Sequence, residues 1–191
     1  MPATDDTTPT PSRTGVSARA LALVGVVAVL VYLADQGAKA LVLTNLEVNE
    51  TVPFIGELLQ LHLVKNAGAA FSLGSGSTWI FAIIASLVVV ALIVFARRIR
   101  SLGWASVFGL LLGGTLGNLN DRLFREPGFG VGHVVDFLQL WGFPAIFNVA
   151  DVGITSAMAL FIILTLRGIN LDGSRVKRTK VAPSDAASDI G

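Results

Sequence analysis

Apolar residues along the chain gather in four stretches that are separated by polar segments. These stretches cover about 19–43, 78–96, 101–122 and 145–166. Each is close to the roughly 20 residues that an α-helix needs to cross the hydrocarbon core of a bilayer. The pattern therefore predicts four membrane-spanning helices.

The basic residues predict how these spans are oriented, because cytoplasmic loops carry an excess of Lys and Arg. Both chain ends and the turn between the second and third spans share one side of the membrane. Ten of the 14 basic residues fall on that side: Arg13, Arg19, Arg97, Arg98, Arg100, Arg167, Arg175, Lys177, Arg178 and Lys180. Both termini are therefore predicted to be cytoplasmic, and two loops of about 44–77 and 123–144 extracytoplasmic.

The longer outer loop has the pattern of a strand. In "LLQLHLVKN", apolar and polar residues alternate from Leu59 to Leu63, as in a half-buried strand. The stretch "NAGAAFSLGSGS" that follows is typical of turns. The expected fold is an all-α membrane protein with four transmembrane helices and a small extracytoplasmic β-sheet between spans one and two.

The two ends of the chain have a different composition from the rest. Residues 1–17 are rich in Pro, Thr and Ser, and residues 169–191 contain the basic patch "SRVKRTK". Both are predicted to be disordered cytoplasmic tails, which leaves a membrane domain of residues 18–168. A cleaved signal peptide is an alternative for the first span. The acidic Asp5 and Asp6 and the apolar residues that resume after Lys39 argue against it.

Composition narrows the chemistry that this chain can perform. Only 14% of residues are charged, whereas soluble domains carry about 25%. The net charge of +1 gives no electrostatic reason to expect nucleic-acid binding. There is no cysteine, and the two histidines, His62 and His133, lack metal-binding spacing, so thiolate chemistry is excluded and neither a metal nor a cofactor is expected.

The polar residues near the spans collect at one depth, next to the predicted outer interface. Asp35 and Lys39 end the first span, Asn118, Asp121 and Arg122 end the third, and Asn148 and Asp151 open the fourth; Asp136 lies in the second outer loop. Residues three or four apart share a helix face. A charged side chain in hydrocarbon costs roughly 2.5–3.5 kcal/mol on insertion scales, so this concentration predicts a site.

Several of these residues also allow a structural explanation. Asp35 and Lys39 suit an ion pair between adjacent turns, and Asp121 with Arg122 suits a charged collar at a helix end. Gly113 and Gly117 are best explained by close helix packing. Asp136 and Asp151 are harder to explain structurally, because neither has a basic neighbour one helical turn away.

Two carboxyl groups held close together in a partly dry pocket share one proton. The ionised member can then deprotonate a water while the protonated member polarises a carbonyl group. This arrangement suggests attack of water on an amide, with Asn118 and Asn148 orienting the aspartates. No serine or threonine sits beside a plausible histidine base, so a histidine-based triad has no candidates.

Five short motifs resemble successive blocks of the lipoprotein signal peptidase (signal peptidase II) family. They are "DQGAKA" at 35–40, "KNAGAAFSL" at 65–73, "GGTLGNLNDR" at 113–122, "VVDF" at 134–137 and "FNVADVGIT" at 147–155. Each motif alone is weak evidence for the family, but five motifs in the family's order across the predicted spans are highly specific for it. Asn120 and "DVGIT", which forms the end of the last motif, depart from the usual family pattern.

The resemblance implies a monomeric aspartic endopeptidase of the bacterial inner membrane. Such enzymes remove the signal peptide from prolipoproteins just before a cysteine that carries a diacylglyceryl group. Matched position by position, Asp136 and Asp151 would form the catalytic dyad. The residues expected to support the dyad or bind substrate are Asn66, Asn118, Arg122 and Asn148. Those expected to give structural support are Asp35, Lys39 and Asp121.

Two other functions are compatible with buried carboxylates. A proton-coupled transporter would place its acidic residues near the midplane and would need a second polar gate, whereas here they gather at one face. A membrane scaffold would account for the spans and glycines. It would leave Asp136 and Asp151 unexplained.

Overall fold

The computed structural model describes residues 16–68 and 77–175. The predicted tails and part of the long outer loop lie largely outside these residues. Four helices form the body of the molecule: α1 (Ala18–Asn45), α2 (Thr78–Ala96), α3 (Leu102–Phe124) and α4 (Val149–Leu166). All four are long and apolar enough to cross a membrane. The prediction of a four-helix membrane protein with a small sheet is confirmed.

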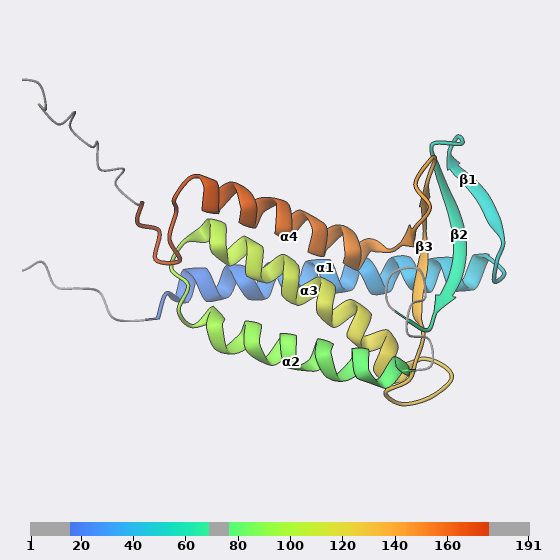
Figure 1. Ribbon diagram of the computed structural model, residues 1–191, viewed down its shortest axis with the longest axis horizontal. Helices are drawn as coiled ribbons and strands as arrows, with labels where there is room; N and C mark the ends of the chain where they lie inside the picture. The colour runs from blue at the N-terminus through green and yellow to red at the C-terminus, as the bar shows by residue number, and fades with distance from the viewer. Residues whose placement is uncertain (1–15, 69–76, 176–191) are drawn as a thin grey trace, which may run out of the picture.

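The sheet lies across one end of the helix bundle, and both described chain ends lie at the opposite end (Figure 1). Its four antiparallel strands are ordered β1 (Thr51–Ile55), β2 (Leu59–Asn66), β3 (Val134–Leu140) and β4 (Ile146–Phe147). The first two strands come from the loop between α1 and α2, as predicted. The other two come from the loop between α3 and α4, which was not predicted to contain strands.

Helix α3 occupies the centre of the bundle and packs against α1, α2 and α4. Its glycines make this possible. A Cβ added at Gly113 would lie 2.6 Å from the backbone oxygen of Ala28, and one at Gly114 would lie 2.5 Å from that of Ala150. The small-residue interface predicted from sequence therefore brings α1 and α4 against α3 on adjacent faces.

Helix α2 contributes little to the interior. Only Thr78, Ala82 and Ala96 of this helix are buried, while apolar residues such as Leu87 are exposed. An exposed apolar surface of this length suits contact with lipid. At the end opposite the sheet, the chain after α4 folds back, and the indole N–H of Trp104 donates to the carbonyl oxygen of Ile169 over 2.8 Å.

The first turn of α4 is fixed by its own residues. Asn148 is the N-cap: its side chain accepts a hydrogen bond from the backbone N–H of Asp151, and the Asp151 carboxylate accepts one from the backbone N–H of Asn148. This reciprocal capping box satisfies two backbone donors that the helix itself leaves unpaired. The helix therefore begins at Val149, and Ile146 and Phe147, which the predicted span included, are in β4.

Candidate active site

Asp136 and Asp151 come from different parts of the fold and line the same cavity. Asp136 is on β3 and is only 4% exposed, and Asp151 is in the first turn of α4. The cavity has a volume of about 600 Å³. The lining near the sheet includes Asn66, Gly68, Asn118, Arg122, Asp136 and Asp151.

Two asparagines connect the aspartates. The Asn148 amide donates to Asp136 Oδ1 over 2.7 Å and to Asn118 Oδ1 over 3.0 Å. The Asn118 amide in turn donates to Asp151 Oδ1 over 2.9 Å. These hydrogen bonds place both amides between the two carboxyl groups, and the role predicted for the two asparagines, to orient the aspartates, stays a prediction.

Asn66 reaches Asp136 because of the strand register. Val64 on β2 pairs with Asp136 on β3, so Asn66, two residues further along β2, is on the same face of the sheet. Its amide donates to Asp136 Oδ2 over 2.9 Å. Both carboxylate oxygens of Asp136 therefore accept an amide N–H.

Burial sets the ionisation of Asp136. The loss of hydration and the nearby Asp151 carboxylate raise the pKa of its carboxyl group to about 6, although the hydrogen bonds from Asn66 and Asn148 act to lower it. Its pKa is therefore well above the ordinary value of 3.8, in the range where a carboxyl group can hold or release a proton near neutral pH.

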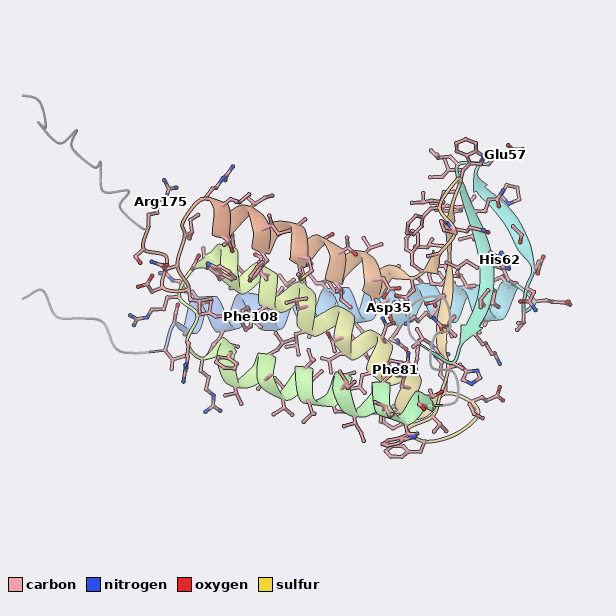
Figure 2. All side chains as sticks on the ribbon, in the orientation of Figure 1. Asp35, Glu57, His62, Phe81, Phe108 and Arg175 are labelled. Carbon is pink, nitrogen blue, oxygen red and sulfur yellow. The ribbon has the colours of Figure 1, made fainter. Side chains whose placement is uncertain are left out.

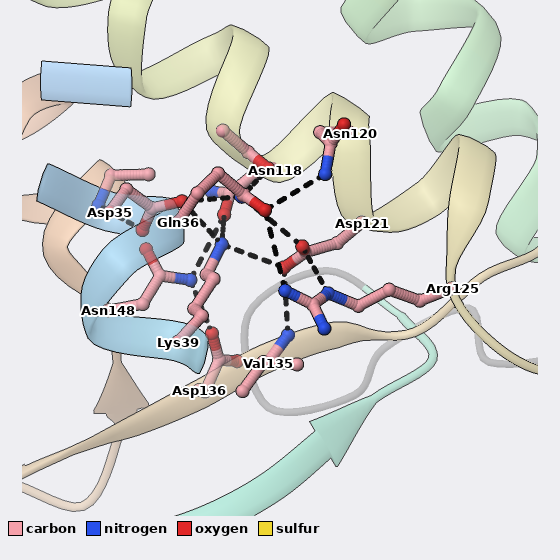
Figure 3. Close-up of polar contacts among 12 residues, drawn as sticks. Asp35, Gln36, Lys39, Asn118, Asn120, Asp121, Arg125, Val135, Asp136 and Asn148 are labelled. Atoms are coloured by element: carbon pink, nitrogen blue, oxygen red, sulfur yellow. Dashed lines mark hydrogen bonds and ion pairs between the residues drawn. The ribbon is translucent and has the colours of Figure 1, made fainter. Parts of the chain in front are cut away.

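Behind the cavity lies a fully buried ion network (Figure 3). Lys39 Nζ is 2.8 Å from Asp35 Oδ2 and 2.7 Å from Asp121 Oδ2, and all three side chains are 0% exposed. Lys39 also donates to Asn118 Oδ1 over 3.0 Å. The ion pair expected between Asp35 and Lys39 is present, and it is joined to the residues that hold the aspartates.

Asp121 and Arg122 diverge although they are adjacent in sequence. Asp121 turns to Lys39 and to Arg125 one helical turn later. Arg122 faces the cavity, where its guanidinium lies 5.1 Å from the centre of the Phe81 ring and its Nη2 donates to the carbonyl oxygen of Gly68. The two residues therefore do not form a simple charged collar.

Sequence reasoning missed several polar residues of this region. Gln36 donates to the carbonyl oxygen of Gly117 over 3.1 Å and accepts from Asn120 over 2.9 Å. Asn120, which departs from the usual family pattern, thus belongs to the polar network. Its position two residues from Asn118 gave no signal, because such residues do not share a helix face.

One side of the cavity is apolar, and it extends from the residues before α4 to the first turn of that helix. This wall is formed by Leu140, Phe143, Ala145, Ile146, Phe147 and Val152. Thr155 and Ser156 also line the cavity, one turn beyond Asp151. Sequence analysis overlooked these two hydroxyl groups. Thr155 is four residues from Asp151 and Ser156 is four residues from Val152, so each shares a helix face with a residue that lines the cavity.

The two histidines lie outside the cavity. His62 is on the sheet (Figure 2), where its ring contacts the Gln139 side chain at 3.0 Å. His133 lines a separate cavity of about 340 Å³ with Lys65 and Arg125. Among residues 16–68 and 77–175, no group of three or more acidic or histidine side chains could hold a metal ion.

Comparisons with known proteins agree with one another. The signal peptidase (SPase) II family model matches residues 27–167. The lipoprotein signal peptidase of Leifsonia xyli is 60% identical over 181 residues, which is 95% of this chain and 83% of that protein. The Streptomyces coelicolor protein of the same name is 46% identical over 156 residues, 82% of this chain and 76% of that protein.

Solved structures show the same fold. A bacterial membrane enzyme determined by the in meso method at 2.3 Å resolution superposes with a TM-score of 0.71 at 28% identity, and covers 86% of this chain and 98% of its own. A second, at 1.9 Å resolution, gives a TM-score of 0.69 at 29% identity and covers 82% of this chain and 99% of its own. The chain therefore belongs to the signal peptidase II family, a group of multi-pass membrane peptidases of bacteria.

Proposed function

We propose that this protein removes the signal peptide from diacylglyceryl-modified prolipoproteins and cleaves just before the lipid-modified cysteine. Asp136 and Asp151 are the catalytic pair in this proposal. The observation that carries it is that two carboxyl groups from β3 and α4 face one cavity and are joined through Asn148 and Asn118.

In the reaction, the pair begins with one proton between its two carboxyl groups. The ionised carboxylate removes a proton from a water, whose oxygen attacks the carbonyl carbon of the scissile amide. The protonated carboxyl donates a hydrogen bond to the carbonyl oxygen and stabilises the charge that develops there. The carboxyl group that took the proton from water then donates it to the amide nitrogen. The C–N bond breaks, and the products are the lipid-modified cysteine with a free amine and the signal peptide with a new carboxyl terminus.

Arg122 is suited to hold the substrate backbone, and Asn66 lines the same cavity. Arg122 is 7% exposed, and its Nη1 atom has no hydrogen-bond partner among the described residues. A buried N–H group without a partner is unfavourable by about 1–3 kcal/mol. A carbonyl oxygen of a bound peptide would remove this penalty, so substrate binding would complete the hydrogen bonding of Arg122.

The apolar wall of the cavity suits the lipid part of the substrate. It runs from Phe143 and Phe147 next to the sheet to Val152 on α4, within a helix that itself spans the membrane. A lipidated precursor already lies in the bilayer, so it can reach this wall by sliding sideways between helices. Acyl chains on the wall would leave the scissile bond beside Asp136 and Asp151.

The experiment that tests this function compares two precursors that differ only in lipid modification. Purified protein in detergent is expected to cleave the diacylglyceryl-modified precursor, with kcat/KM at least about 100-fold above that for the unmodified one, because only the former gains binding from burial of its acyl chains. Mass spectrometry of the product should show the lipid-modified cysteine as the new N-terminus. Equal cleavage of both precursors would contradict the lipid requirement.

We also propose that the sheet and the cavity are extracytoplasmic and that both termini are cytoplasmic. The support is charge: Arg97, Arg98 and Arg167 lie at the end of the bundle away from the sheet, and Arg175 is visible there in Figure 2. Basic residues of this kind concentrate in cytoplasmic loops.

Because the chain contains no cysteine, single cysteines can report this orientation. In intact spheroplasts, the cysteine of a Glu57→Cys variant, in the turn between β1 and β2, is expected to react with a membrane-impermeant maleimide. A cysteine at Arg97, the matched site at the other end, should react only after the cells are opened. The reverse pattern would show that the predicted orientation is wrong.

A further inference from the structure

The residue that precedes each catalytic aspartate is held in the same way. The backbone N–H of Val135, just before Asp136, donates to Asp121 Oδ2 over 3.1 Å. The backbone N–H of Ala150, just before Asp151, donates to Asp35 Oδ1 over 2.9 Å. A buried carboxylate thus fixes the backbone next to each member of the pair.

Lys39 connects these two carboxylates. It lies 2.8 Å from Asp35 and 2.7 Å from Asp121, and Figure 3 shows its ammonium group at the centre of these contacts. An ammonium group has three N–H donors and no acceptor. The third contact is Asn118 Oδ1, at 3.0 Å, so all three donors have partners.

This third contact decides how the Asn118 amide is turned. Because an ammonium group can only donate, the Asn118 oxygen must face Lys39 and its NH₂ group must face away. That NH₂ group donates to Asp151 Oδ1, while the oxygen also accepts from Asn148, which holds Asp136. The direction of these hydrogen bonds therefore follows from the charge of Lys39.

We propose that Lys39 is a positioning residue that sets the separation and orientation of Asp136 and Asp151, through Asp35, Asp121 and Asn118. This inference rests on the proposed function, since it names what holds the catalytic pair. If Lys39 only formed a structural ion pair within α1, Asp35 would be a sufficient partner. Here the lysine also joins α1 to α3, and its two carboxylate partners bind the backbone beside the two reacting groups.

Lys39 also contributes to the electrostatics of Asp136. The charged groups around Asp136 are Asp151 from α4, Lys39 from α1 and Arg122 from α3. Asp151 raises the pKa of Asp136 and Lys39 lowers it. Loss of the lysine charge should therefore move the pKa of Asp136 further up from about 6.

The test compares Lys39→Met with Lys65→Met. Lys65 also forms an ion pair, with Glu126 at 3.0 Å, but both side chains are partly or largely exposed and neither lines the cavity. Methionine keeps much of the length of lysine and removes its charge. Lys39→Met leaves a buried carboxylate uncompensated and can prevent folding. The second variant, Lys39→Met with Asp35→Asn, removes that charge and retains an oxygen for the N–H of Ala150.

If Lys39 positions the pair, the folded double variant should lose at least about 100-fold in kcat with KM within about 3-fold, because small misplacement of reacting groups has effects of this size. The kcat of the double variant is compared with that of Asp35→Asn alone. The kcat of Lys65→Met should equal that of wild type. The alkaline limb of the pH–rate profile should move to higher pH. Wild-type kcat in the folded double variant would overturn the proposal.

A second measurement separates this proposal from the proposed function. The titration of Asp136, followed by NMR with ¹³Cγ-labelled aspartate, should have a higher midpoint in the double variant than in Asp35→Asn. It requires no turnover. If wild-type protein fails to cleave the lipidated precursor, the proposed function is wrong, and the titration still reports on Lys39. An unchanged midpoint would show that Lys39 does not act on Asp136.

Discussion

Replacement of either Asp136 or Asp151 with asparagine is expected to lower kcat for the lipidated precursor by about 10³-fold or more. Asparagine has nearly the same size but can neither remove a proton from water nor supply one to the leaving amine. Positioned acid–base groups each contribute about 10²–10⁴-fold. Since the two aspartates work as one unit, the double variant should be little worse than either single variant.

The measurement is single-turnover cleavage, together with binding of the lipidated precursor. Binding should persist in both variants, because the apolar wall and Arg122 are unchanged. Asp172→Asn is the matched control: Asp172 is exposed, bonds to the backbone of Ser174 and lies outside the cavity. If Asp136→Asn or Asp151→Asn cleaves at a rate near that of wild type, that residue is not part of the catalytic pair.

Gly114→Ala is expected to destabilise the fold severely, with a decrease in thermal midpoint of several degrees or loss of folded protein. The added Cβ would lie 2.5 Å from the backbone oxygen of Ala150 and 2.8 Å from Cγ1 of Ile154. A clash with backbone cannot be relieved by rotating a side chain, so α3 and α4 must move apart. Overpacking of this kind typically costs about 1–3 kcal/mol and occasionally more.

The matched control for this prediction is Gly25→Ala on α1, where an added Cβ meets no atom within 4 Å. In a helix, alanine is more favourable than glycine by about 0.8–1.0 kcal/mol, so this variant should be as stable as wild type or slightly more stable. Thermal unfolding in detergent, followed by light scattering and circular dichroism, distinguishes the two. Equal midpoints would show that α3 and α4 are packed less closely than the structure indicates.

A shift of α4 would also affect catalysis. Ala150 is fully buried, and its backbone N–H binds Asp35 immediately before Asp151. The glycine interface of α3 thus serves two purposes: it packs the bundle and it places one of the two aspartates that line the cavity. In the Gly114→Ala variant, the activity per folded molecule should therefore also be lower than in wild type.

The limits of prediction are clearest in the second outer loop. Residues 123–144 were expected to form a loop, yet β3 (Val134–Leu140) lies within it and carries Asp136. The strand is recognised only through its partner, since β2 lies some 70 residues earlier in the chain and pairs with it through Val64 and Asp136. Pairing at such a separation depends on tertiary packing, which a local pattern does not contain.

The sequence by itself determined the four spans and the polar positions beside them. Hydrophobic length and the cost of charge in lipid are properties of each segment alone, and they indicated the polar positions of the spans before any contact was known. Asp136, in an outer loop, was indicated by its lack of a basic neighbour and by the motif resemblance. Only the tertiary structure decided the partner of each polar group: that Asp121 turns to Lys39 while Arg122 faces the cavity, and that Asp35 caps the backbone before Asp151. A hydrogen bond requires two atoms within about 3 Å, and only the packing of glycine-lined helices against the sheet brings such distant residues that close.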